Sequence, residues 1–338
     1  MRSTTIRDVA RRAGVSIATV SRVMRDSQPV RPDTRDRVLA AAHELEYTPS
    51  QLGRQLAERR HAANGIVFPD LSGPYYAEVV LGYEAVAAEL RRSVLILSTH
   101  GRTDAEAAVR EMAGRCDGLV ILGRTVSDAV IESLADRGSR LVLVARPPIG
   151  SVDSVNAENH ASAVALTEHL LAGGARRLCF VGDPAGSPDV AERWQGVQDA
   201  VAAHADHDGG EPATLDRVSG DEYDETAGAK IAAAALAWDR LPDAFVCAND
   251  ELALGLIGGL RAAGVDVPGA VRVTGWDDVM AARYAGLTTV RQPMRQIGAT
   301  AARLLDELIL GDRTEPRHEL LPTELVLRNS STPHRKEP

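Results

Sequence analysis

Two short amphipathic segments joined by a turn open the chain, and they constrain its fold more than any other feature. The apolar residues of the first segment recur at helical spacing, namely Ile6, Val9, Ala10 and Ala13. Gly14 can adopt the positive φ that ends a helix sharply. Ser16 can cap the next helix by accepting a backbone N–H. The segments therefore predict a helix-turn-helix, with Val20, Val23 and Met24 pointing inward.

The start of the second predicted helix carries side chains suited to DNA. In a helix-turn-helix this part of the helix enters the major groove. The planar fork of Arg22 can contact guanine, while Ile17 and Ala18 can touch thymine methyl groups. Four hydroxyl side chains suit the phosphate contacts that set register: Thr5, Ser16, Thr19 and Ser21. An ordinary helical hairpin with a solvated outer face is the alternative interpretation.

A third helix and the distribution of charge agree with a DNA-binding head. Pro32 suits the first turn of a helix, and Arg31 before it offers no conventional cap. Apolar residues on this helix are expected to close a small core, namely Val38, Leu39, Ala42 and Leu45. The first 61 residues hold 12 arginines and 7 acidic residues, a balance of +5, whereas the remainder balances to −14. A basic head on an acidic body is typical of a phosphate-binding module joined to a domain that does not contact DNA.

The overall composition indicates a soluble globular protein with two or three domains in 338 residues. No run of about 18 apolar residues predicts a membrane span, and charged residues interrupt any apolar signal near the N-terminus. We therefore expect the cytoplasm. The three cysteines lie in apolar strand-like runs without metal-ligand spacing. No metal and no cofactor is expected.

Beyond about residue 62, short apolar runs alternate with amphipathic stretches. The predicted strands are 65–68, 94–97, 118–122, 141–144, 178–181, 244–247 and 271–275. The predicted helices between them include 75–91, 103–114, 160–172, 190–204, 226–238 and 250–263. Continuous apolar strands alternating with helices predict parallel sheets covered on both faces. Two such sets predict an α/β body of two Rossmann-like subdomains, with a ligand cleft at the carboxyl ends of the strands.

Residues 3–60 resemble the DNA-binding head and hinge of the LacI/GalR (lactose-repressor-like) family of bacterial transcriptional regulators. The body resembles the periplasmic-binding-protein-like core of that family in several phrases, namely 68–78, 116–120, 248–250, 275–278 and 287–293. The resemblance implies a head at 1–48, a hinge helix at 49–61 and an effector-binding and dimerisation domain at 62–330. It also implies an N-subdomain of 62–160 with 291–322, a C-subdomain of 161–290 and a polar tail at 331–338.

The resemblance further implies roles in the hinge. Leu52, Gly53 and Leu56 are expected to contact DNA, with Leu56 wedged into a minor-groove base step. Gly53 stands where the family more often has alanine, so the hinge helix is expected to be harder to form without DNA. The residues implied to line the effector cleft are Tyr75, Tyr76, Arg146, Asp189, Arg193, Tyr223, Asn249 and Asp277.

Each cleft residue also has a purely structural interpretation. The tyrosines can cap a subdomain core, Asn249 can cap a helix, Asp277 can serve a turn, and Asp189 can be a helix N-terminal carboxylate. Aromatic walls with arginine, asparagine and aspartate edges suit a polyhydroxylated ring. We therefore expect a sugar or sugar derivative as effector, although a nucleobase would use similar chemistry.

The sequence thus predicts a homodimeric transcriptional regulator, more specifically a repressor, that binds pseudo-palindromic operator DNA and responds to a small molecule. An enzyme is the first alternative, but neither a dinucleotide-binding glycine motif nor a phosphate loop is present. The stretch 204–208 has metal-ligand residue types, yet it lies in a polar, Gly-rich region typical of a loop. A transport binding protein would explain the body but not the head, and a purine- or nucleoside-responsive regulator remains open.

Overall fold

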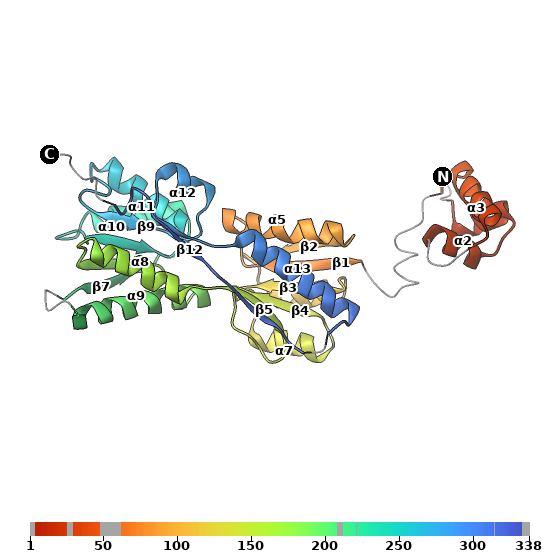
Figure 1. Cartoon of the computed structure of the whole chain (residues 1–338), viewed down its shortest axis with the longest axis horizontal. Coiled ribbons are helices and arrows are strands. Elements are labelled where there is room, and N and C mark those ends of the chain that lie inside the picture. The colour runs from red at the N-terminus through yellow and green to blue at the C-terminus, as the bar shows by residue number, and fades with distance from the viewer. Residues whose placement is uncertain are drawn as a thin grey trace. The chain divides into compact units, whose positions relative to one another are not determined.

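A computed structural model of the chain describes residues 4–25, 30–47, 62–207, 212–220, 222–313 and 315–332. The chain forms two compact units, Met1–His61 and Ala62–Pro338. Figure 1 draws these units in colours that follow the sequence. We call the first unit the head and the second the body.

Within its described residues, the head contains three helices around a small apolar core. They are α1 (Ile6–Ala13), α2 (Ile17–Arg25) and α3 (Pro32–Glu44). Gly14 ends α1 with a φ of 66°, and Pro32 begins α3 without a side-chain cap from Arg31. The buried residues are Val9, Ala10, Val20, Val23, Val38, Ala41 and Ala42. The helix-turn-helix prediction is confirmed, but Leu39 is 43% exposed and does not belong to this core.

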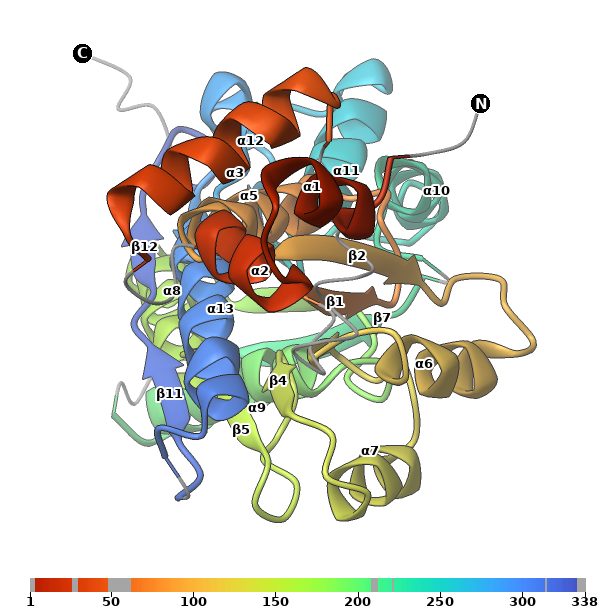
Figure 2. The ribbon, with the colours of Figure 1, turned by 90° about the vertical axis from the view of Figure 1, so that its right-hand side faces the viewer.

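The body begins with a lobe built on a six-stranded sheet, which we call the N-lobe. Its strand order is β11-β5-β4-β3-β1-β2, and all the pairings are parallel. The strands are β1 (Ala63–Phe68), β2 (Ser93–Ser98), β3 (Gly118–Leu122), β4 (Leu141–Val144), β5 (Asp153–Ala157) and β11 (His318–Leu321). One face is covered by α5 (Pro74–Glu89) and α13 (Met294–Leu310), the other by α6 (Ala105–Ala113) and α7 (Asp128–Asp136). Figure 2 shows the sheet between these two pairs of helices.

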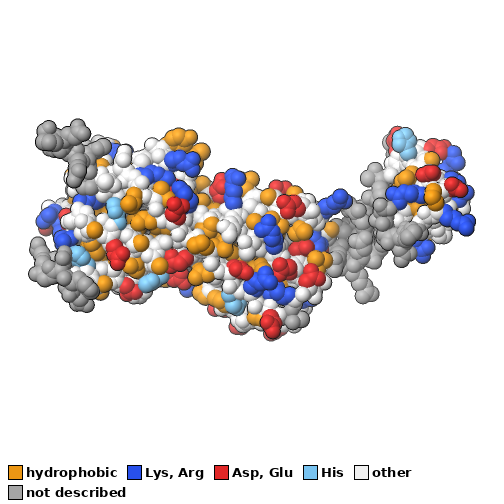
Figure 3. All heavy atoms as spheres, viewed as in Figure 1, with side chains coloured by type: hydrophobic (Ala, Val, Ile, Leu, Met, Phe, Trp, Pro, Cys, Tyr) orange, Lys and Arg blue, Asp and Glu red, His pale blue; other side chains and the backbone are white. Residues whose placement is uncertain are grey.

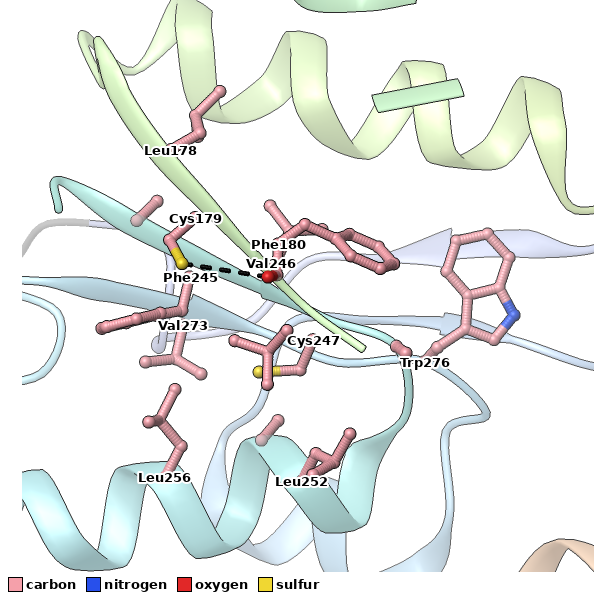
Figure 4. Packing of buried hydrophobic residues seen from close by; sticks show 14 of the residues in the cluster. Leu178, Cys179, Phe180, Phe245, Val246, Cys247, Leu252, Leu256, Val273 and Trp276 are labelled. Atoms are coloured by element: carbon pink, nitrogen blue, oxygen red, sulfur yellow. Dashed lines mark hydrogen bonds between the residues drawn. The ribbon is translucent and has the colours of Figure 1, made fainter. Parts of the chain in front are cut away.

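The second lobe of the body, the C-lobe, surrounds a four-stranded parallel sheet of order β7-β6-β8-β9. The strands are β6 (Arg177–Val181), β7 (Thr214–Val218), β8 (Ala244–Cys247) and β9 (Arg272–Thr274). Its helices are α8 (His160–Ala172), α9 (Pro188–His207), α10 (Glu225–Ala235) and α11 (Asp250–Ala262). Figure 4 shows Leu252 and Leu256 of α11 facing strand residues such as Val246 and Val273 across this core. The predicted α/β body with two parallel sheets is confirmed.

The chain passes between the lobes at three places. β5 of the N-lobe leads directly to α8 of the C-lobe, and β9 leads through α12 (Met280–Ala285) and β10 (Thr289–Arg291) to α13. After β11, β12 (Glu324–Val326) pairs antiparallel with β10. Ser330 then returns to the C-lobe, where its carbonyl accepts from the N–H of Val273. Two of the three crossings are thus paired strands, which limits how the lobes can move.

The helices α5 and α13 approach each other closely because glycines face each other across their contact. A Cβ added at Gly82 would overlap the carbonyl oxygen of Arg295, and one at Gly298 would overlap that of Val79. The two backbones therefore touch, and the pair behaves as one rigid layer of the N-lobe.

Gly82→Ala should destabilise the body, because the new methyl group can be accommodated only if α5 and α13 separate. Overpacking of this kind costs typically about 1–3 kcal/mol, and here the obstacle is backbone rather than a flexible side chain. The free energy of unfolding, measured by urea denaturation, should fall accordingly.

Gly258→Ala is a matched control, because Gly258 also lies within a helix, α11, but has open space around it. That substitution should raise the stability by about 0.5–1 kcal/mol through helix propensity. Equal effects of the two alanines would show that helix propensity, rather than the contact of the two backbones, decides the result.

Candidate DNA-reading surface and effector site

The predicted DNA-reading residues of α2 lie on the surface of the head. Ile17 is 45% exposed, and Ala18 and Arg22 are also exposed. Arg22 forms no ion pair with any residue in the described part of the chain. Thr19 and Ser21 are half-buried. Figure 3 shows basic side chains on the surface of this unit. This arrangement leaves the outer face of α2 open to a ligand.

Two of the predicted phosphate-contacting hydroxyls also serve as helix caps. Ser16 Oγ accepts from the N–H of Thr19 at 3.1 Å and lies 2.9 Å from Thr19 Oγ1, as expected for a cap of α2. Thr5 Oγ1 and N–H both donate to Asp8 Oδ2, at 2.6 and 3.0 Å, in the capping box of α1. The predicted hinge contacts Leu52, Gly53 and Leu56 lie outside the described residues.

In the body, Arg193 is the centre of a polar cluster where the strands of both sheets end. Its side chain projects from α9 and is only 7% exposed. Nε donates to Asn159 Oδ1 at 2.8 Å, and one terminal nitrogen donates to the carbonyl of Ala248 at 2.6 Å. The guanidinium lies 4.6 Å from the ring centre of Trp276, which favours a cation–π contact. Asp189, one turn earlier on α9, is 3.9 Å away.

Asp277 joins this cluster to the strands that cross between the lobes. It follows β9, is nearly buried, and has a φ of 115°, which is unfavourable for a side-chain-bearing residue. Its N–H donates to the carbonyl of Val290, and its Oδ1 accepts from Gln292 Nε2 at 2.6 Å. Burial raises the pKa of Asp277 to about 6, although Arg193 and Gln292 oppose the shift.

Tyr75 and Tyr76 bring the N-lobe into the cluster from the first turn of α5. Their rings pack edge-to-face with centroids 5.3 Å apart, and Tyr76 also packs against Phe68 at 5.5 Å. Burial raises the pKa of Tyr75 well above its ordinary value, and the carboxylates of Asp189 and Asp277 raise it further. The Tyr75 phenol therefore lies near side chains that follow the C-lobe strands.

Tyr223 and Asn249 are held in the framework of the C-lobe. Asn249 caps α11 by accepting from the N–H of Leu252, and its amide donates to the carbonyl of Tyr223 at 2.8 Å. The Tyr223 hydroxyl donates to the carbonyl of Asp183 and accepts from that residue's N–H. The helix-cap interpretation of Asn249 is thus observed, and it leaves open a contact between either side chain and a ligand.

Arg146 occupies a different position from the other predicted cleft residues. Its side chain is buried within the N-lobe, where it donates to the carbonyls of Gly123 and Val126 and pairs with Asp128. None of these bonds involves the cluster around Arg193. A contact between Arg146 and an effector stays a prediction, and the bonds of its side chain do not support it.

The structure adds three residues to this site that were not among the predicted effector contacts, namely Asn159, Trp276 and Gln292. Trp276 Nε1 and Gln292 Oε1 are buried and have no hydrogen-bond partner in the part of the chain that the structure describes. Figure 4 shows the Trp276 indole at one end of the C-lobe core. An unsatisfied donor and acceptor beside a charged cluster suit a polar ligand. The sequence could have indicated these residues by their positions, because each follows a strand: Trp276 stands next to Asp277, and Asn159 and Gln292 lie where the chain crosses between the lobes.

The lobes also touch beside this cluster. Arg124, which follows β3, donates to the carbonyl of Ala185 after β6 at 3.0 Å. The Glu251 carboxyl lies against Gly73, because a Cβ added there would be 3.2 Å from Glu251 Oε1. Burial, followed by the charges of Asp277 and other carboxylates, raises the pKa of Glu251 to about 7. Acidic charge thus accumulates at the contact between the lobes.

Comparisons with known proteins agree with this architecture. Residues 5–50 match the family described as bacterial regulatory proteins, lacI family, and residues 167–331 match a periplasmic binding protein-like domain. The chain is 34% identical to the HTH-type transcriptional regulator GalR of Escherichia coli, over 97% of this chain and 96% of that protein. It is 32% identical to the regulator CelR of Thermobifida fusca, over 97% and 98%. The chain belongs to the lacI family.

Solved structures of family members extend the comparison to three dimensions. A Lac repressor dimer bound to operator and the anti-inducer ONPF matches with a TM-score of 0.86 and 26% identity, over 98% of this chain and all of that one. A CelR–cellobiose complex matches with a TM-score of 0.69 and 29% identity, over 97% and 99%. Both the fold and the relatives therefore show that this lacI-family member is a DNA-binding transcriptional regulator.

Two further observations concern other kinds of site. Within the described residues, no group of three His, Cys, Asp or Glu side chains is arranged to hold a metal ion. Among the helices described, none has both the length and the apolar character needed to cross a membrane.

Asp277→Asn should change how the stability of the body depends on pH. Because the pKa of Asp277 rises from 3.8 to about 6 on folding, the native state binds more protons than the unfolded state between these values. Stability of the wild type should therefore fall as pH rises through this window, by at most about 3 kcal/mol. Asparagine keeps an acceptor for Gln292 and removes this loss.

The measurement is urea denaturation of both proteins at intervals from pH 4 to 8. The difference in unfolding free energy should grow in favour of Asp277→Asn up to about pH 7 and then level off. Parallel curves for the two proteins would contradict the burial of an ionisable carboxyl at this position.

Proposed function

We propose that this protein is a homodimeric transcriptional repressor whose affinity for operator DNA is controlled by a sugar bound between the two lobes. The observation that carries the proposal is the cluster of Arg193, Asp277 and Trp276, whose charged members act on Tyr75 of the other lobe. A guanidinium and a carboxylate can hold neighbouring hydroxyls, and aromatic rings can stack on the apolar face of a sugar ring. The unpaired Trp276 Nε1 and Gln292 Oε1 add a donor and an acceptor.

The relatives support each part of this proposal. The Lac repressor structure is a dimer on operator DNA, and the CelR structure holds cellobiose. We infer the same division of labour here, with a DNA-reading head at 1–48, a hinge at 49–61 and an effector-binding and dimerisation domain at 62–330. The protein then acts in the cytoplasm, as a binding protein rather than an enzyme.

Control of DNA binding follows from the position of the site between two lobes. A ligand that contacts Tyr75 in the N-lobe and Arg193 in the C-lobe stabilises one arrangement of the lobes over another. In a dimer this changes the spacing of the two heads, so ligand and operator affect each other's affinity reciprocally.

Arg193→Gln should abolish the response to sugar while leaving operator affinity without sugar within about threefold of the wild type. The change removes a charge-assisted donor at the centre of the cluster. Ligands are first sought by a thermal-shift screen of mono- and disaccharides with nucleosides as competitors, since a ligand at 100 times its Kd adds about 2.7 kcal/mol of stability. Sugar affinity of the variant should fall at least tenfold.

Arg217→Gln provides a matched control. Arg217 also stacks on a tryptophan of the C-lobe, with its guanidinium 5.8 Å from the Trp194 ring centre, but it is exposed on β7. This variant should keep wild-type sugar affinity. If nucleosides stabilise the wild type and sugars do not, the effector contains a nucleobase and the proposal of a sugar is wrong.

Arg22→Ala should weaken binding to the preferred DNA sequence by about 1–3 kcal/mol and relax specificity at one base pair. The preferred duplex is selected by the wild-type protein from a random-sequence pool, and affinities are measured by fluorescence anisotropy at fixed salt. Arg102→Ala, which removes an exposed arginine paired with Asp104 in the body, is the control and should leave affinity unchanged. Equal losses on preferred and random duplexes would assign Arg22 a phosphate contact instead.

A further inference from the structure

An arginine whose side chain is largely buried lies between two aspartates at the end of the N-lobe opposite the polar cluster. One terminal nitrogen of Arg92 donates to Asp117 Oδ2 at 3.0 Å, and the other donates to Asp306 Oδ1 at 2.8 Å. The three side chains are only 10%, 6% and 11% exposed. They come from the segment after α5, the segment before β3 and the later turns of α13. We call them the Arg92 triad.

The triad also holds the residue at which the body begins. The N–H of Ala62 donates at 2.9 Å to Asp117 Oδ2, the same oxygen that accepts from Arg92. The carbonyl of Ala62 accepts from the N–H of Ser93, the residue after Arg92. Ala62 has a φ of 51°, a conformation that L-residues seldom adopt without support from their surroundings. The triad therefore helps to hold the backbone conformation of Ala62, the first residue of the body.

Two helices connect the triad to the proposed sugar site. α5 begins with Pro74, next to Tyr75 and Tyr76, and ends at Glu89, three residues before Arg92. α13 begins two residues after Gln292 and contains Asp306. Each helix is about 25 Å long, and their backbones touch at Gly82 and Gly298. A displacement of their first turns at the site is thus carried as a rigid movement to their far ends.

A largely buried triad of this kind fixes the relative positions of the segments that carry it, but it adds little to the stability of the fold. The desolvation of three charges offsets most of their attraction, so the net contribution to stability is small. Loss of one partner leaves a buried charge unpaired, however, so the three groups and the segments that carry them must move together. A purely apolar contact could slide, whereas two charge-assisted bonds on one planar guanidinium hold a defined geometry.

We propose that the Arg92 triad is the positioning element that couples the α5–α13 pair to the start of the body at Ala62, and so carries sugar occupancy to the DNA-reading heads. This inference rests on the proposed function. Arg92 contacts neither DNA nor sugar in this scheme; it acts through Asp117 and Asp306.

The test uses the full chain with Arg92→Gln, Asp306→Asn and the double variant, and the duplex selected by the wild type. Each single variant should bind that duplex at least tenfold more weakly or lose at least two-thirds of the change in affinity caused by the sugar found in the screen. Sugar affinity itself should stay within threefold of the wild type. The double variant should be no worse than the more affected single variant, because both remove the same connection.

Arg140→Gln is the matched control. Arg140 also binds the end of α13, through the Leu308 carbonyl at 3.0 Å, but among the described residues its side chain bonds to neither Asp117 nor Ala62. This variant should keep wild-type DNA affinity and sugar response, even if its melting temperature falls. Similar losses in Arg140→Gln and Arg92→Gln would reduce the triad to a general structural role and overturn the proposal.

If Arg92→Gln does not fold, Arg92→Lys decides the question, because lysine keeps the charge but cannot form the same fork to both aspartates. Wild-type DNA affinity and sugar response in this folded variant would overturn the proposal. A wild-type protein that binds no duplex would instead overturn the proposed function. The two failures are therefore distinguishable.

Discussion

The buried guanidinium of Arg193 is the interaction around which the junction of the two lobes is organised. A charge removed from water must be paired and hydrogen-bonded, or it destabilises the fold by several kcal/mol. Its partners Asn159, Ala248 and Trp276 follow three different strands, β5, β8 and β9. The hydrogen bonds and the ring contact of this one side chain therefore hold together the three segments that follow these strands. The same positive charge limits the rise in the pKa of Asp189 and Asp277 that burial causes.

Parallel sheets give the N-lobe two chemically different ends. The carboxyl ends of its strands face the polar cluster, while their amino ends include Ala63, where the chain enters from the head, and Gly118, which follows Asp117. The helices α5 and α13 run between these ends, with a contact between their backbones that leaves no room for a side chain. A lobe of this design connects its two ends through rigid elements rather than through a flexible chain.

The elements that were predictable from sequence are those whose pattern is local. All seven predicted strands were found, and the predicted helix 160–172 has the bounds of α8. β5, with the sequence DSVNA, was missed because its polar residues are satisfied only in the fold; Asp153, for example, accepts from Arg313 and from the N–H of Arg317. Leu39 was assigned to the head core, yet Val38, Ala41 and Ala42 occupy that stripe of α3 and leave Leu39 exposed.

The helix-turn-helix, the alternation that produces two parallel sheets, and most residues at the strand ends were predictable from the chain alone, because these depend on spacing along it. Which of those residues meet depends on how the lobes pack in three dimensions. Tyr75, Arg193 and Asp277 come together and Arg146 is bound elsewhere in the N-lobe, since proximity across three chain crossings leaves no periodic signal. The pairing of Arg92 with Asp306, 214 residues apart, likewise exists only through packing.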